Sequence, residues 1–204
     1  MPSPSPLRYG AYYHIYNRGA NRASVFTEKR NYCFFMERYA KYIEPVAFTY
    51  VYCLLDNHFH FVVRTKTPEE QKESLKNPET FRLLEPSRQF SNLFNSYAKA
   101  FNKMYNRSGS LFEHPFRRIE IETDAHFVQL IAYIHRNPQE HSLADDFRNW
   151  PFSSYQAILT KQPTRVQRDE VLEWFGGLEG FLRHHEVEID SRQIAPVVIE
   201  DSDL

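Results

Sequence analysis

The first half of the chain alternates between stretches typical of strands and one stretch typical of a helix. Residues 12–16 are rich in tyrosine and end at an Asn-Arg-Gly turn, which is typical of a strand. Apolar residues then recur at helical spacing over residues 27–44, and a proline ends this predicted helix. Residues 46–55 and 58–64 are apolar runs separated by an Asp-Asn dipeptide, so we expect a tight hairpin.

The pattern continues with a long helix, a strand and a second long helix. Residues 66–86 are charged and contain three prolines, so we interpret them as a variable connection with a short helical piece. Residues 86–105 place aromatic and aliphatic side chains on one helical face. Residues 110–122 are typical of a strand, and residues 123–135 of a helix that Pro138 breaks.

The order of these elements predicts the fold class. A β-α-β-β-α-β-α order fits one antiparallel sheet with helices on one face, the ferredoxin-like plan of an α+β protein. We assign residues 10–155 to this domain and residues 156–204 to a C-terminal extension with one or two short helices and a loose tail. The Pro/Ser-rich residues 1–9 are expected to be disordered.

Composition narrows the class of protein. The chain has 204 residues, 42% of them apolar and 16% aromatic, which is enough for a dense core. It contains no apolar run of the roughly 18 residues that span a bilayer, and its start lacks the apolar stretch of a signal peptide. Cys33 and Cys53 are too few for a disulfide framework. We therefore expect a cytoplasmic protein with reduced thiols and no membrane partner.

Charge is distributed unevenly along the chain. The formal net charge is only -1, but residues 1–119 carry 18 Lys and Arg against 10 Asp and Glu, a net of +8. Residues 120–204 carry 7 against 16, a net of -9. A protein with a basic front and an acidic back can bind nucleic acid on one face, although solvated surface charge explains the same asymmetry.

The triplet His58-Phe59-His60 is the first candidate for chemistry. Side chains alternate along a strand, so both imidazoles point to one face and Phe59 points to the other. Two imidazoles at this spacing can bind one divalent ion. The pattern alone is weak evidence, and two ordinary strand histidines are the alternative.

Tyr133 and Asn137 are the second candidate. They are four residues apart and therefore share one face of the predicted helix. The amide oxygen of Asn137 is a possible third ligand for a hard ion, and Tyr133 presents a phenol beside it. The alternatives are a core tyrosine and an asparagine that merely ends a helix before Pro138. A metal that polarises a phosphodiester would let a phenol attack it.

Taken together, these segments resemble a known family. The sequence resembles the single-tyrosine HUH transposases of the IS200/IS605 type, and most of all their repeat-associated tyrosine transposase branch. The resemblance covers most of the chain, and only the joint pattern is specific. The matching stretches, in the family's order, are residues 13–19, 54–60, 111–112 with 116–118, 133–138 and 150–155.

The resemblance implies roles for individual residues. His58 and His60 match the metal-binding pair of the HUH motif, Tyr133 matches the nucleophile, and Asn137 matches the third ligand of the repeat-associated branch. The implied cofactor is Mg²⁺ or Mn²⁺, because imidazole and amide donors leave open positions for phosphate oxygens and water. Asp56 stands where the family often has proline, which puts DNA sequence preference in question and removes no ligand.

Basic and aromatic residues alternate in the basic part, as in proteins that bind single strands. We favour Arg117 and Arg118 as DNA contacts, although each residue in this group is also explained as a solvated charge. The candidate DNA-binding residues are Arg18, Arg22, Arg88, Lys99, Lys103, Arg107, Arg117 and Arg118.

The remaining histidines receive less weight. We expect His14 to pack in the core with one hydrogen bond. The alternative is that it approaches the site from the first strand. His135 lies off the Tyr133 face and is assigned no role. The pair His184-His185 is interpreted as exposed helix.

The sequence thus predicts a metal-dependent single-stranded DNA transposase that cleaves and rejoins DNA near hairpins through a 5′-phosphotyrosine intermediate. The alternatives are a replication-initiator or relaxase-type nickase, which shares the chemistry, and a protein that binds hairpin DNA without cutting it. The expected partner is single-stranded or hairpin DNA. A monomer is favoured because of the C-terminal extension, and a homodimer is possible.

Overall fold

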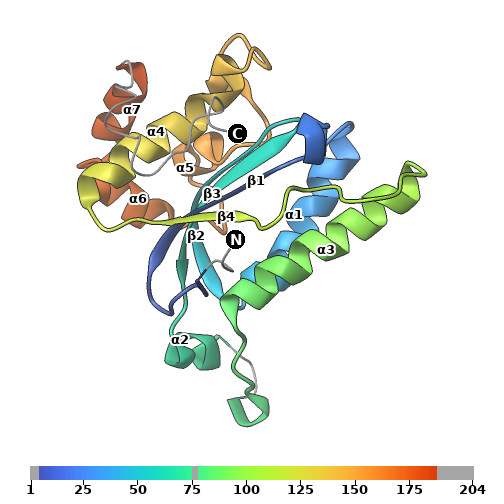
Figure 1. Ribbon diagram of the computed structural model, residues 1–204. Helices are drawn as coiled ribbons and strands as arrows, with labels where there is room; N and C mark the ends of the chain where they lie inside the picture. The colour runs from blue at the N-terminus through green and yellow to red at the C-terminus, as the bar shows by residue number, and fades with distance from the viewer. Residues whose placement is uncertain (1–4, 75–77, 188–204) are drawn as a thin grey trace.

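The computed structural model describes residues 5–74 and 78–187, and its centre is one antiparallel sheet. The strands lie in the order β2-β3-β1-β4 (Figure 1). This arrangement confirms the predicted α+β class and the β2–β3 hairpin. The strands are β1 (Tyr12–Arg18), β2 (Ala47–Leu54), β3 (His58–Thr65) and β4 (Arg117–Glu120).

Seven α-helices surround the sheet in the described residues, with three short 3₁₀ helices at Ala20–Arg22 (η1), Pro78–Thr80 (η2) and Phe147–Asn149 (η3). The order of the main elements along the chain is the predicted one. The α-helices are α1 (Lys29–Ile43), α2 (Pro68–Glu73), α3 (Pro86–Met104), α4 (Asp124–Glu140), α5 (Tyr155–Leu159), α6 (Arg168–Trp174) and α7 (Leu178–Glu186).

The helices cover both faces of the sheet, which differs from the one-sided plan that the sequence predicted. α1 and α3 pack on one face, whereas α4 and the helices after it pack on the other (Figure 1). The reason is visible in β3, where seven of eight residues are buried. Phe59 and Phe61 point to the α1–α3 side and Val62 to the α4 side. A strand whose side chains are buried on both faces is covered on both.

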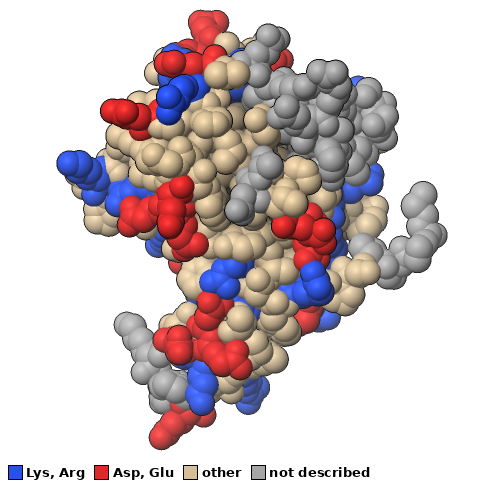
Figure 2. All heavy atoms as spheres, turned by 90° about the vertical axis from the view of Figure 1, so that its left-hand side faces the viewer, with Lys and Arg blue, Asp and Glu red and all other residues tan. Residues whose placement is uncertain are grey.

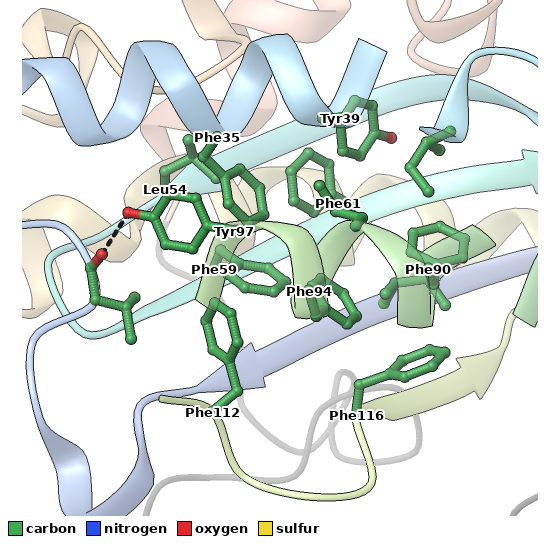
Figure 3. Packing of buried hydrophobic residues seen from close by; sticks show 14 of the residues in the cluster. Phe35, Tyr39, Leu54, Phe59, Phe61, Phe90, Phe94, Tyr97, Phe112 and Phe116 are labelled. Carbon is green, nitrogen blue, oxygen red and sulfur yellow. Dashed lines mark hydrogen bonds between the residues drawn. The ribbon is translucent and has the colours of Figure 1, made fainter. Parts of the chain in front are cut away.

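The core between the sheet and α1 and α3 is aromatic. Figure 3 shows Phe35 of α1 and Tyr97 of α3 beside Phe59 of β3. The ring centroids of Phe35 and Tyr97 are 5.1 Å apart with an edge-to-face angle of 82°. The Tyr97 hydroxyl donates a 2.6 Å hydrogen bond to the Val25 carbonyl, which satisfies the polar end of a buried ring.

A second core forms under α4 and includes the helices of the C-terminal extension. Ile131 and Ile134 of α4 pack with Val62 of the sheet. Tyr155 and Phe181, from α5 and α7, belong to the same cluster. Described residues of the extension therefore share a core with the sheet rather than forming a separate body.

α4 continues past the point where the sequence predicted its end. Pro138 lies inside the helix, which runs on to Glu140. A proline in a helix interior costs about 3 kcal/mol, but here only two residues of the helix, Gln139 and Glu140, follow it, and Pro138 is buried. Tyr133 and Asn137 consequently stand on one unbroken helix.

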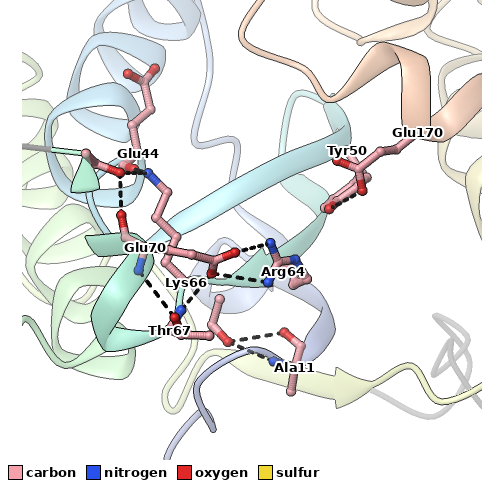
Figure 4. A network of polar contacts seen from close by, with 10 residues as sticks. Ala11, Glu44, Tyr50, Arg64, Lys66, Thr67, Glu70 and Glu170 are labelled. Carbon is pink, nitrogen blue, oxygen red and sulfur yellow. Dashed lines mark hydrogen bonds and ion pairs between the residues drawn. The ribbon is translucent and has the colours of Figure 1, made fainter. Parts of the chain in front are cut away.

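Polar contacts fasten the connection between β3 and α3 to the sheet (Figure 4). Arg64 of β3 forms an ion pair with Glu70 of α2 at 2.7 Å, and Glu70 accepts a hydrogen bond from the Thr67 amide at 2.8 Å. Lys66 donates a 2.8 Å hydrogen bond to the Glu44 carbonyl. The short helical piece predicted in this connection is α2.

The described part of the N-terminal segment is packed, contrary to the expected disorder of residues 1–9. Leu7 is buried, and its amide donates a 2.8 Å hydrogen bond to Ser87 Oγ at the start of α3. Residues 1–4 and the expected loose tail beyond Arg192 lie outside the described residues. Among the described helices, none combines the length and apolar character needed to cross a membrane.

Candidate active site

The strand register places several polar side chains on the sheet face that α4 covers. Across β1 and β3, Arg18 pairs with His58 and Tyr16 pairs with His60. On the other side of β1, Tyr16 pairs with Arg117 of β4. Directly opposed residues of antiparallel strands point to the same face. These five residues therefore form one polar patch in an otherwise apolar interface.

Hydrogen bonds hold both imidazoles of the His-Phe-His triplet. The rings of His58 and His60 are 7% and 5% exposed, with centroids 5.1 Å apart. Nδ1 of His58 donates to Asn57 Oδ1 at 2.6 Å, which leaves the Nε2 lone pair of a neutral ring available. Nδ1 of His60 lies 3.0 Å from Nε2 of the fully buried His14. Such partners orient the ligand rings of metal sites.

α4 brings three further groups to the same place. Tyr133, Asn137 and His141 are spaced by four residues and share one helical face. The ring of Tyr133 lies 6.0 Å from that of His60, and the ring of His141 lies 4.8 Å from that of His58. The Asn137 amide nitrogen donates to the Tyr133 carbonyl at 2.8 Å, so the nitrogen is engaged.

Buried polar atoms without partners concentrate in this patch. Five buried side-chain atoms lack a hydrogen-bond partner within the described residues, and three of them are Tyr16 Oη, His60 Nε2 and Asn137 Oδ1. Buried polar atoms are normally paired, so unpaired ones that gather at one point indicate a place for a ligand.

The unpaired atoms fit a divalent cation. His60 supplies an imidazole nitrogen, Asn137 an amide oxygen, and His58 a second imidazole. In the described part of the chain, no three His, Cys, Asp or Glu side chains are placed to hold a metal together. The donors that the structure brings together here are two imidazoles and one amide, the types that the resemblance implied, and such a set would leave open positions on a bound cation.

Burial keeps both histidines in the form that binds metal. Burial lowers the pKa of His58 to about 3, the neighbouring His141 and Arg18 act in the same direction, and the side chain of Asn137 opposes them. Burial, followed by the neighbouring imidazoles, lowers the pKa of His60 well below its ordinary value. Both rings are thus neutral at neutral pH, and neutral imidazole is the metal-binding form.

The patch also contains positive charge beside the phenols. Arg18 is 7% exposed, and burial lowers its pKa while Glu113 opposes that shift. An arginine remains protonated nonetheless, because its ordinary pKa is far above neutrality. Burial raises the pKa of Tyr16, the charge of Arg117 lowers it, and Tyr133 raises it. The phenols and the guanidinium groups therefore lie within electrostatic reach of one another.

Comparison with known proteins bears on this arrangement. No protein-family model and no curated protein matches the chain. A solved structure does match, described as a REP-associated tyrosine transposase bound to a REP hairpin, with a TM-score of 0.55 and 16% sequence identity. The match covers 80% of this chain and 88% of that one. This chain has the fold of a tyrosine transposase. The resemblance inferred from sequence is thereby confirmed at the level of the fold.

Within this tyrosine-transposase fold, the predicted DNA-binding residues do not form one group. Arg18 and Arg117 lie on the α4 face near Tyr133. Arg22 is exposed in η1, which directly follows β1. These three lie on or next to the strand that carries the patch.

Arg118, which the sequence favoured equally with Arg117, faces the other way. It pairs with Ile15, whose side chain belongs to the α1–α3 core. Its guanidinium lies 3.9 Å from the Phe116 ring centroid and donates to the Ser5 carbonyl at 3.3 Å. Successive strand residues point to opposite faces, so Arg118 is not brought to the site.

The remaining basic candidates belong to the helix on the far side of the sheet. Arg88, Lys99 and Lys103 are exposed on α3, and Arg107 follows the end of that helix. The charge asymmetry along the chain does not produce a surface of one sign on the face that Figure 2 shows. Figure 2 shows blue and red side chains close together around an uncharged middle, not a face of one sign.

Sequence reasoning missed His141 and Tyr16, and it treated an approach of His14 to the site only as the alternative to core packing. His141 extends the four-residue spacing of Tyr133 and Asn137 by one step, but the helix was expected to end before it. Tyr16 and His14 point to the same face because they are two residues apart, as the two histidines of the triplet are. Their contact with the triplet depends on the pairing of β1 with β3, which a single sequence does not specify.

Proposed function

We propose that this protein cleaves and rejoins single-stranded DNA beside a hairpin, with Tyr133 as the nucleophile and Mg²⁺ or Mn²⁺ as the cofactor. The observation that carries the proposal is the pair of unpaired buried atoms, His60 Nε2 and Asn137 Oδ1, beside a tyrosine on a tyrosine-transposase fold. The fold match alone would also suit a protein that only binds DNA.

The proposed reaction is an exchange of one phosphodiester for another. The Tyr133 oxygen bonds to phosphorus, the bond from phosphorus to the 3′ oxygen breaks, and the product is a 5′-phosphotyrosine with a free 3′-OH. The phenol proton leaves to solvent, and the departing 3′ oxygen takes up a proton. Because the energy of the broken bond is kept in the phosphotyrosine, a 3′-OH can later reverse the step and join two strands.

The protein's contribution is mainly position and charge. His58, His60 and Asn137 would hold the cation, which supplies Lewis-acid stabilisation of the phosphate charge when bound. Arg18 and Arg117 place fixed positive charge near Tyr133, where the strand's phosphates would lie. The hairpin is proposed as the partner because the matching structure is described as bound to one.

Formation of a covalent adduct tests the proposal. The protein is incubated with Mn²⁺ and a library of single strands that carry one hairpin flanked by random tetranucleotides. We expect a protein–DNA adduct that resists SDS and that peptide mapping places on Tyr133. Tyr133→Phe is expected to lower adduct formation at least a thousandfold while retaining DNA binding, because it removes only the attacking oxygen.

The outcomes separate the competing functions. Binding without an adduct for the unmodified protein favours the hairpin-binding alternative. An adduct on another residue, or one that survives in Tyr133→Phe, refutes the assigned nucleophile. A second strand with a free 3′-OH distinguishes strand joining from nicking alone, since only a joining enzyme yields a longer DNA product.

A further inference from the structure

Tyr16 has an unusual environment for a tyrosine. Its side chain lies in the middle of β1, facing α4, and is 7% exposed. Its hydroxyl oxygen is buried and has no hydrogen-bond partner within residues 5–74 and 78–187. By contrast, the hydroxyls of Tyr39 and Tyr97, which are buried in the core, bond to Thr49 and to the Val25 carbonyl.

Ring packing, and not hydrogen bonding, fixes the position of this hydroxyl. The Tyr16 ring stacks on His14 with centroids 4.7 Å apart and an angle of 23°. It is also parallel to the His60 ring within 20°, at 5.9 Å. The hydroxyl is therefore held in place although nothing described in the protein bonds to it.

The surroundings indicate which ligand would satisfy it. Tyr16 is the direct strand partner of Arg117, and Tyr133 lies within electrostatic reach of both Tyr16 and Arg18. A phenol is protonated at neutral pH and can donate a hydrogen bond. A donor beside the Arg117 guanidinium calls for an anionic acceptor that approaches Tyr133, and a phosphodiester oxygen has this chemistry.

We propose that the Tyr16 hydroxyl binds a non-bridging oxygen of one phosphodiester of the DNA strand, the phosphodiester that Tyr133 attacks. This inference rests on the proposed function and adds a phosphate-binding residue to it. Tyr16 would hold the phosphate on the β4 side of His60, away from His58. The rigid stacking on His14 would keep the donor aligned before DNA arrives.

The variant Tyr16→Phe tests this assignment because it removes the hydroxyl and keeps the stacked ring. We expect the rate of adduct formation to fall tenfold or more, as for the loss of a hydrogen bond to a charged oxygen. The melting temperature should stay the same or rise, because the variant no longer buries an unpaired polar atom. If Tyr16 had only a structural role, Tyr16→Phe would keep the rate of adduct formation and lower the melting temperature.

Tyr13→Phe is the matched control. Tyr13 lies on the same strand but points to the opposite face, where its hydroxyl donates to Glu120 at 3.3 Å and accepts from the Arg8 amide at 3.0 Å. This variant should keep the rate of adduct formation, and its melting temperature should fall or stay unchanged.

A second measurement works without cleavage. In the Tyr133→Phe background, DNA affinity is measured for strands that each carry one uncharged methylphosphonate. We expect Tyr16→Phe to weaken binding of the unmodified strand severalfold but to have no further effect when one particular phosphate is replaced, since both changes remove the same contact. In an active protein, that phosphate is the one cleaved.

The possible results are distinct. The assignment of Tyr16 to a phosphate is overturned if Tyr16→Phe forms the adduct and binds DNA as the parent does. It is also overturned if the effects of Tyr16→Phe and of methylphosphonate replacement are additive at every phosphate. The protein could also form no adduct while Tyr16→Phe and the replacement of one phosphate have non-additive effects on affinity. That result supports the phosphate site and refutes the proposed cleavage.

Discussion

Asn137 shows how a single buried atom links stability to function. Its oxygen is buried and without a partner in the described residues, while its nitrogen bonds to the Tyr133 carbonyl one turn away. An unpaired buried acceptor costs the fold about 1–3 kcal/mol. A bound cation would remove that cost, so the residue that weakens the metal-free protein is the one expected to strengthen the metal-bound one.

This reasoning predicts the behaviour of Asn137→Leu. Without metal, its free energy of unfolding should equal or exceed that of the parent by about 1 kcal/mol, because a polar atom is no longer buried unpaired. The parent should gain about 2.7 kcal/mol at a Mn²⁺ concentration a hundred times its Kd, and the variant should gain far less. Chemical denaturation with and without Mn²⁺ measures both effects.

Asn95→Leu is the control, because Asn95 is exposed on α3, across the sheet from the site. It should respond to Mn²⁺ as the parent does. A full Mn²⁺ response in Asn137→Leu would remove Asn137 from the ligand set.

At the scale of elements, α4 is held against the extension by a buried pair of histidines. Nδ1 of His135 lies 2.9 Å from Nε2 of His185 on α7, and Nε2 of His135 lies 2.8 Å from Ser154 Oγ. The sequence analysis interpreted His184 and His185 as exposed, but only His184 is; His185 is 1% exposed. In a nine-residue helix, adjacent positions face in different directions, so one histidine of the pair points inward.

The burial of His185 predicts an acid-sensitive attachment of α7. Burial lowers the pKa of His185 to about 4, against about 6.5 in an unfolded chain. Between these values the unfolded chain binds more protons, so stability is lost as the pH falls, by about 3 kcal/mol in total. His185→Phe should reduce the slope of unfolding free energy against pH over this window by the share of one histidine, while the buried His58, His60 and His135, whose pKa values burial also lowers, keep the rest of the slope.

Urea denaturation at several pH values between 4 and 7 checks this expectation. His184→Gln changes the exposed neighbour and should keep the slope of the parent. An unchanged slope in His185→Phe would mean that another group carries the acid sensitivity.

Much of the element pattern could be predicted because local sequence determines it. The hairpin, the long α3 helix and the order of strands and helices follow from periodicity and turn residues. The length of α4 could not be predicted, because tertiary burial of Pro138 offsets its local cost. The helices on the second face also escaped prediction, because the residues of β3 on that face are mostly polar and do not show that the face is covered.

At the scale of the whole molecule, the sheet separates two sides with different tasks. The α1–α3 side is an aromatic core, and the α4 side holds the polar patch as well as a second core. A DNA strand bound at Tyr133 would lie on the α4 side of the sheet. The basic residues of α3 project from the opposite side. We therefore expect the predicted DNA contacts to divide according to the face on which they lie.

Salt-dependent binding tests this division. Arg117→Gln should weaken hairpin binding and reduce the slope of log affinity against log salt by about 1, as expected when one phosphate contact is lost. Lys99→Gln, on α3, should leave both affinity and slope unchanged. Equal losses for the two variants would show that DNA contacts both sides of the molecule.

The candidate site was predictable in its residue types but not in its geometry. The His-Phe-His triplet and the Tyr133–Asn137 spacing are local patterns, and the structure brings all four side chains together. The neighbouring sequence does not decide which of Arg117 and Arg118 faces the site. Alternation shows that only one of them faces the site, but the pairing of β4 with β1 decides which one.

The position of Tyr133 and Asn137 on one helix has a consequence for how activity could be controlled. The proposed nucleophile and one proposed ligand stand one turn apart on a single rigid rod, at a rise of about 1.5 Å per residue. The histidine pair stands on the sheet, a separate rigid body. Any displacement of α4 relative to the sheet would therefore move the proposed nucleophile and the proposed ligand away from the two histidines together.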